Sequence, residues 1–123
     1  MKINWKKLTA GEQPLLLPGA VGNIEAKLHL PTPNNLAESA KAVLICCHPH
    51  PQFGGTMDNK VVHTVVKTFS KMGVPALRFN FRGIGQSEGN YDEGRGESED
   101  LLMLSNLMQK SWPDSQLWLA GFS

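Results

Sequence analysis

The N-terminal third of the chain contains two short apolar segments separated by turn-forming residues. Residues Ile24–Leu30 alternate between apolar and polar positions, which predicts a strand with one buried face. Leu15–Leu17 precede it across Pro18, Gly19 and Gly22, so we expect an antiparallel hairpin at the edge of a sheet. His29 falls on the polar face of the second segment, and we expect it to be solvated.

Three later runs are largely apolar, namely Ala42–Cys47, Val74–Phe81 and Gln116–Ala120. Such runs are typical of parallel strands that are buried on both faces. Between them, apolar residues at helical spacing predict helices over Asn59–Met72 and Glu97–Lys110. The order strand–strand–strand–helix–strand–helix–strand predicts an α/β fold, with a mostly parallel sheet and crossover helices.

Composition narrows the class of protein. The chain has 123 residues, 41% of them hydrophobic, which suits one globular domain with one core. A net charge of +1 gives no basic surface for nucleic acid. No run is long enough to span a membrane, and no signal-peptide stretch follows Met1. We therefore expect a cytoplasmic protein without a membrane or nucleic-acid partner.

The two cysteines, Cys46 and Cys47, are adjacent within a predicted strand. Neighbours on a strand point to opposite faces, so a disulfide between them would be strained. We interpret them as core thiols of a reduced, intracellular protein. A reactive cysteine is the less favoured alternative, because no base or cation is placed to form the thiolate.

The loop after the first buried strand, His48–Met57, carries the first candidate chemistry. Two glycines let its backbone approach a ligand, and free N–H groups there could stabilise an oxyanion. The candidate donors and substrate contacts are His50, Gln52, Phe53, Gly54 and Gly55. His48 is interpreted as a hydrogen-bonded residue that orients the loop. A His-x-His metal site is not favoured, because no Asp follows at a suitable spacing.

The loop after the second buried strand, Asn80–Gly89, partly matches the nucleotide-binding pattern G-x-G-x-x-G. Gly83 and Gly85 fit, but Glu88 occupies the sixth position and would repel a pyrophosphate. The glycines can simply permit a tight turn, and we expect no nucleotide cofactor.

The last segment, Leu117–Ser123, is a hydrophobic strand that runs into Gly-x-Ser. This is the front half of the nucleophile elbow G-x-S-x-G, in which a sharp turn lifts the serine hydroxyl out of the sheet. Gly-x-Ser alone is common by chance, so the pattern depends on the other two loops.

Taken together, four segments resemble the first half of a small serine hydrolase of the α/β-hydrolase superfamily, in the esterase-like branch near dienelactone hydrolases. The matching segments are His48–Met57, Arg78–Gly89, Gly94–Asp100 and Leu119–Ser123. The resemblance extends over residues 12–123 and implies a three-layer fold that stops after the strand before the nucleophile. Residues 1–123 would then be the N-terminal portion of a single domain.

The resemblance implies roles for particular residues. Ser123 would be the nucleophile, and the His50 N–H would be one oxyanion donor. Arg82, Gly83 and Gly85 would belong to a structural loop. The acid and base of the triad follow later in this family, and none of the four histidines (His29, His48, His50 and His63) matches the catalytic one.

Two classes of function therefore remain open. The first is a serine hydrolase for a small-molecule ester or related acyl substrate, without cofactor or metal, which this chain alone would not complete. The alternative is a non-catalytic binding or scaffold protein with the same fold. A nucleotide-binding domain is a third and weaker interpretation, against which Glu88 argues.

Overall fold

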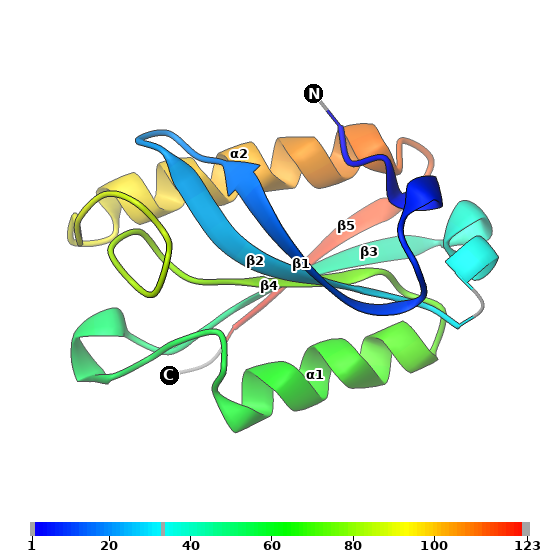
Figure 1. Cartoon of the computed structure of the whole chain (residues 1–123), viewed down its shortest axis with the longest axis horizontal. Helices are drawn as coiled ribbons and strands as arrows, with labels where there is room; N and C mark the ends of the chain where they lie inside the picture. The colour runs from blue at the N-terminus through cyan, green and yellow to red at the C-terminus, as the bar shows by residue number, and fades with distance from the viewer. Residues whose placement is uncertain (1, 33, 122–123) are drawn as a thin grey trace.

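A computed structural model describes residues 2–32 and 34–121, without the side chains of residues 34–36 (Figure 1). Ser123, the predicted nucleophile, lies outside the described residues. No helix in the described part of the chain is long and apolar enough to cross a membrane.

The strands and α-helices follow one another in the predicted order. The strands are β1 (Gly11–Pro18), β2 (Asn23–Leu30), β3 (Ala42–Cys47), β4 (Ala76–Phe79) and β5 (Gln116–Gly121). The helices are α1 (Lys60–Lys71) and α2 (Arg95–Ser111), so the second begins two residues earlier than expected. Three short 3₁₀ helices, which the apolar pattern did not predict, are η1 (Trp5–Lys7), η2 (Asn34–Ser39) and η3 (Pro51–Phe53).

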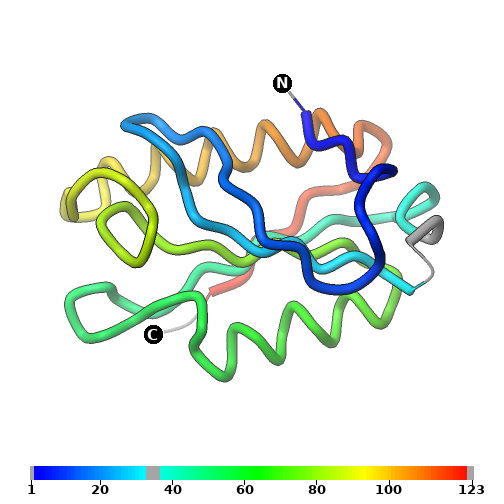
Figure 2. The backbone as a smooth tube through the Cα atoms, viewed as in Figure 1, coloured from blue at the N-terminus to red at the C-terminus, as the bar shows by residue number. Residues whose placement is uncertain are grey.

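The five strands form one mixed sheet in the order β1-β2-β4-β3-β5. β3 pairs in parallel with both β4 and β5, whereas β2 pairs antiparallel with both β1 and β4. Of the strands in the described part of the chain, four therefore run in one direction and only β2 runs against them. The predicted hairpin and mostly parallel sheet are confirmed, with the hairpin at one edge and β5 at the other (Figure 2).

One helix covers each face of the sheet, which gives three layers (Figure 1). Val43 and Ile45 of β3 join the larger core with Leu104 and Met108 of α2. The alternate β3 residues, Leu44 and Cys46, pack with Val62 and Val66 of α1. This alternation is why β3 is apolar at every position: each face of a central parallel strand meets a helix.

The expectation that Gln116–Ala120 is buried on both faces is wrong for this chain. β5 pairs only with β3 among the described strands, and Trp118 and Leu119 are 43% and 55% exposed. Its apolar composition matches that of a central strand, but burial depends on neighbours that β5 lacks here.

Candidate active site

The three glycine-containing loops begin at the same edge of the sheet. In the parallel pairing of β3 with β5, Cys47 lies opposite Gly121, and β4 ends beside β3 on the other side. The chain therefore leaves β3 toward His50 and leaves β5 toward residues 122–123 from neighbouring points. The carboxyl edge of parallel strands is where α/β proteins place their ligands.

Hydrogen bonds within residues 50–55 leave one N–H group without an acceptor among the described residues. His50 caps η3: its Nδ1 accepts from the Gln52 N–H at 3.1 Å, and its carbonyl accepts from the N–H groups of Phe53 and Gly55. The Gly54 N–H donates to Pro51. Within residues 50–55, only the His50 N–H has no acceptor among the described residues.

Two glycines in this loop are needed for different reasons. Gly54 ends η3 in the left-handed conformation, with φ at 80°, where side chains are unfavourable. A Cβ atom at Gly55 would lie 2.0 Å from the Pro49 carbonyl oxygen and 2.8 Å from that of His50. Gly55 therefore permits the tight contact between the two ends of the loop.

His48 is buried at the base of the loop and is fully hydrogen-bonded. Its Nε2 accepts from the Phe81 N–H at 3.1 Å, and this assigns the proton to Nδ1, which donates to the Pro49 carbonyl at 2.6 Å. Burial lowers the pKa of His48 below its usual value, although the Pro49 contact opposes this. A neutral His48 thus connects the loops that follow β3 and β4.

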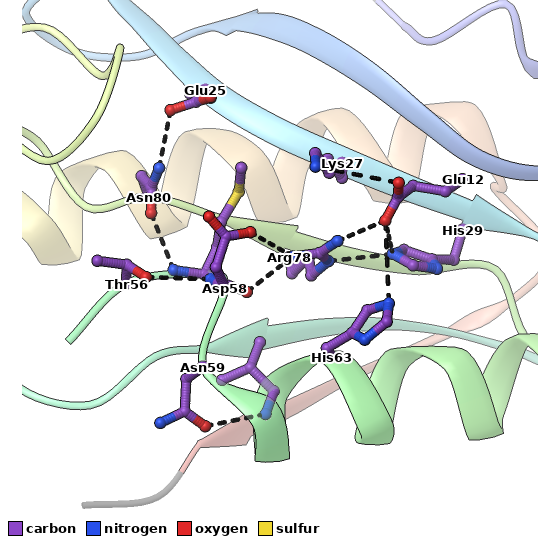
Figure 3. Close-up of polar contacts among 12 residues, drawn as sticks. Glu12, Glu25, Lys27, His29, Thr56, Asp58, Asn59, His63, Arg78 and Asn80 are labelled. Atoms are coloured by element: carbon purple, nitrogen blue, oxygen red, sulfur yellow. Dashed lines mark hydrogen bonds and ion pairs between the residues drawn. The ribbon is translucent and has the colours of Figure 1, made fainter.

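Asn80 ties the other end of the loop to β2, a role that the sequence analysis missed. Its Oδ1 accepts from the Met57 N–H at 2.9 Å, and its Nδ2 donates to Glu25 at 2.8 Å (Figure 3). Glu25 also accepts from the Gln86 N–H. A Cβ at Gly85 would lie 2.4 Å from the same Glu25 oxygen, so this glycine leaves room for the network. The sequence did offer one indication of this role, because Asn80 is a polar residue directly after a buried strand.

Arg82 and the segment Gly94–Asp100 form a single structural unit. The Arg82 guanidinium donates to Asp100 and to the Gly96 carbonyl, both at 2.8 Å. The hydrogen bond to Asp100 raises the pKa of Arg82. A Cβ at Gly96 would lie 2.1 Å from the Arg82 guanidinium, which explains that glycine. Gly83, at φ 82°, turns the chain after Arg82.

The start of α2 is held by Glu97. Its two carboxylate oxygens accept from the N–H groups of Asp92 and Gly94, both at 2.9 Å. Together with the Arg82–Asp100 pair, this fixes the loop of residues 89–95 above the carboxyl edge of the sheet. The Gly-x-Gly-Glu-x-x-Asp segment therefore has a structural role, which is to hold the start of α2 against the loop after β4; its spacing alone did not indicate this role.

A second polar cluster surrounds Arg78 on the α1 side of the sheet (Figure 3). Arg78 is buried and donates to Glu12, to Nε2 of His29 at 3.1 Å, and to Asp58 at 3.0 Å. The expectation that His29 is solvated is wrong: it is 5% exposed. Burial, with the nearby Arg78 charge second, lowers the pKa of His29 to about 4.

The two cysteines are unpaired, as predicted. Cys46 is buried and Cys47 is half-buried at the end of β3. Burial raises the pKa of both thiols, that of Cys47 to about 11, so both are neutral at physiological pH. Across the described residues, no group of three His, Cys, Asp or Glu side chains could hold a metal ion.

Comparison with known proteins supports the fold. An uncharacterized protein of Rickettsia prowazekii (strain Madrid E), RP471, is 37% identical over 106 residues, covering 85% of this chain and 42% of that protein. An alpha-beta serine hydrolase homologue from Coxiella burnetii has a TM-score of 0.81 and 41% identity, over 92% of this chain and 52% of that one.

A third relative is XC6422 from Xanthomonas campestris, described as an α/β serine hydrolase without lid. It has a TM-score of 0.81 and 36% identity, over 92% of this chain and 51% of that one. No protein-family profile matches the chain. The chain thus spans about half the length of the proteins it resembles. It has the α/β-hydrolase fold and corresponds to the N-terminal half of that fold, as the sequence predicted.

Proposed function

We propose that this chain contributes the nucleophile and one oxyanion donor of a serine hydrolase that acts on a small-molecule ester or related acyl bond. The observation that carries the proposal is the pairing of Cys47 with Gly121. It brings the unpaired His50 N–H and the strand that leads to Ser123 to adjacent points on one edge. A serine attack on a carbonyl there would place the developing oxyanion near that donor.

The chemistry needs groups beyond those described. A serine hydroxyl is a weak nucleophile without an adjacent base, and the described histidines are engaged elsewhere: His29 with Arg78, and His48 with the backbone. The acid, the base and the second oxyanion donor would come from the second half of the fold. The unpaired thiols of Cys46 and Cys47 support a reducing compartment, the cytoplasm, for this activity.

The test uses a serine-directed fluorophosphonate together with hydrolysis of a short-chain aryl ester. A chain continued through the second half of the fold is expected to be labelled and to turn over the ester, and Ser123→Ala to abolish both. The 123-residue chain alone is expected to do neither. Ester turnover that survives Ser123→Ala would contradict the nucleophile assignment. A continued chain that folds but is inactive would favour a binding or scaffold protein instead.

A further inference from the structure

A hollow of about 460 Å³ lies between the loop after β3 and the N-terminal turns of α2. Its size falls within the range of pockets that bind small molecules. The wall includes the thiol of Cys47, the rings of His48, Phe81 and Tyr91, and Leu101 of α2. His48 and Phe81 are in contact, with ring centroids 4.0 Å apart. These groups are apolar or neutral, because burial keeps both Cys47 and His48 uncharged.

The hollow also presents a side-chain hydrogen-bond donor, the Tyr91 hydroxyl. Tyr91 contacts His50, with 3.2 Å between its hydroxyl and Nε2. Nδ1 of His50 already accepts from the Gln52 N–H, so neutral His50 carries its proton on Nε2 and donates it to the Tyr91 oxygen. The Tyr91 hydroxyl hydrogen is then available to an oxygen acceptor of a ligand.

The charged residues that line the hollow are both acidic. Glu93 and Glu97 are the charged lining residues, and the lining contains no lysine or arginine. The Glu97 carboxylate is already occupied by the N–H groups of Asp92 and Gly94. Glu93 is exposed, and within the described part of the chain it forms no ion pair. A ligand that carries its own carboxylate would meet this charge with no compensating cation among the residues that line the hollow.

We propose that this hollow binds the uncharged, apolar part of the substrate, and that Glu93 selects against substrates bearing a carboxylate. The inference rests on the proposed function, since His50 is shared between the hollow and the oxyanion loop. It goes further by assigning a substrate class: neutral esters with an aryl or alkyl group, held by the aromatic wall and by the Tyr91 hydroxyl.

Binding to the 123-residue chain tests this without any catalytic step. Benzylacetone and hydrocinnamate have the same skeleton, except that a neutral methyl ketone in one replaces the carboxylate of the other. Tyr91 is the sole tyrosine, so its ring signals in an NMR titration report on the hollow directly. The ketone is expected to shift these signals, and the carboxylate to bind about threefold more weakly, as for a partly exposed charge pair.

Matched variants isolate the charge of Glu93. Its φ is 55°, a conformation that Asn and Asp tolerate, so Glu93→Asn removes the charge and Glu93→Asp retains it. In the Asn variant the affinities for benzylacetone and hydrocinnamate are expected to become equal. In the Asp variant the ketone is expected to bind more tightly than the carboxylate, as in the unmodified chain. Glu99→Gln, which removes an exposed charge that does not line the hollow, should leave the difference unchanged.

The outcomes are separable from those of the hydrolase test. The inference is overturned if neither ligand shifts the Tyr91 signals, or if the Asn variant discriminates as strongly as the unmodified chain. Selective binding together with no fluorophosphonate labelling of a continued chain would retain this site and refute the serine hydrolase. Labelling without selective binding would retain the hydrolase and refute the site.

Discussion

The guanidinium of Arg82 donates from Nε to Oδ2 of Asp100 at 2.8 Å, and both side chains are buried. The other Asp100 oxygen accepts from the Ala20 N–H in the turn between β1 and β2. One carboxylate therefore connects the hairpin, the loop after β4 and the start of α2. This contact holds together the side of the candidate site that faces α2.

Asp100→Asn is expected to lower the free energy of unfolding by about 3 kcal/mol, because it leaves a buried guanidinium without its counter-charge. Urea denaturation measures the change. Asp114→Asn, at an exposed position near the end of α2, is the control and should change stability by less than about 0.5 kcal/mol. Equal effects of the two substitutions would contradict a structural role for the pair.

Gly55→Ala is expected to disturb the oxyanion loop more than Gly54→Ala. At Gly55 the new Cβ would overlap the backbone of Pro49 and His50, which must shift at a cost of about 1–3 kcal/mol. At Gly54 nothing lies within 4 Å, and the cost is the left-handed backbone alone, about 1 kcal/mol. Thermal unfolding ranks the variants, and amide chemical shifts of His50 should move more in Gly55→Ala. The reverse ranking would refute the tight contact.

The free energy of unfolding is expected to decrease as the pH is lowered, because His29 becomes protonated more readily in the unfolded chain. Its pKa is about 4 in the folded protein and about 6.5 in the unfolded chain, so the unfolded state binds a proton first as the pH falls. The contribution is intact above about pH 6.5 and is lost progressively down to about pH 4, on the order of 3 kcal/mol in full.

Other ionisable groups interact with His29 in the same cluster, so its own part must be isolated; they are Arg78, Glu12, His63 and Lys27. His29→Gln should be less stable at neutral pH and should show a flatter pH dependence between about pH 6.5 and 4. The difference between the two unfolding curves measures this. Parallel curves across that range would show that His29 does not titrate as the buried environment requires.

The 123-residue chain is expected to self-associate through β5. Its outer edge is unpaired within the described residues, and Leu119 is 55% exposed beside Trp118. Leu119→Lys should reduce the association in sedimentation experiments, since a charge on an edge strand opposes further pairing. Leu102→Lys on α2, where the leucine is 62% exposed, is the control. A monomeric unmodified chain would contradict this prediction.

The sequence alone was enough to determine the order and type of the main elements. The periodicity of Ile24–Leu30 and the uninterrupted apolar run of Ala42–Cys47 reflect how each backbone presents its side chains, and the structure has strands at both places. The elbow-like end and the glycine loop also pointed to the α/β-hydrolase superfamily, because those turns need particular residue types at fixed spacing.

Only the tertiary structure decided which faces are covered and which polar groups meet. The alternating pattern of β2 places His29 on the face opposite the apolar residues. The pattern could not show that Arg78 of β4 lies beside His29, or that α1 covers this face. The same holds for β5, whose apolar composition suits burial while its edge position leaves it exposed. Local patterns depend on one strand or helix, whereas burial and pairing depend on segments that are distant in sequence, such as Asn80 with Glu25 and Arg82 with Asp100.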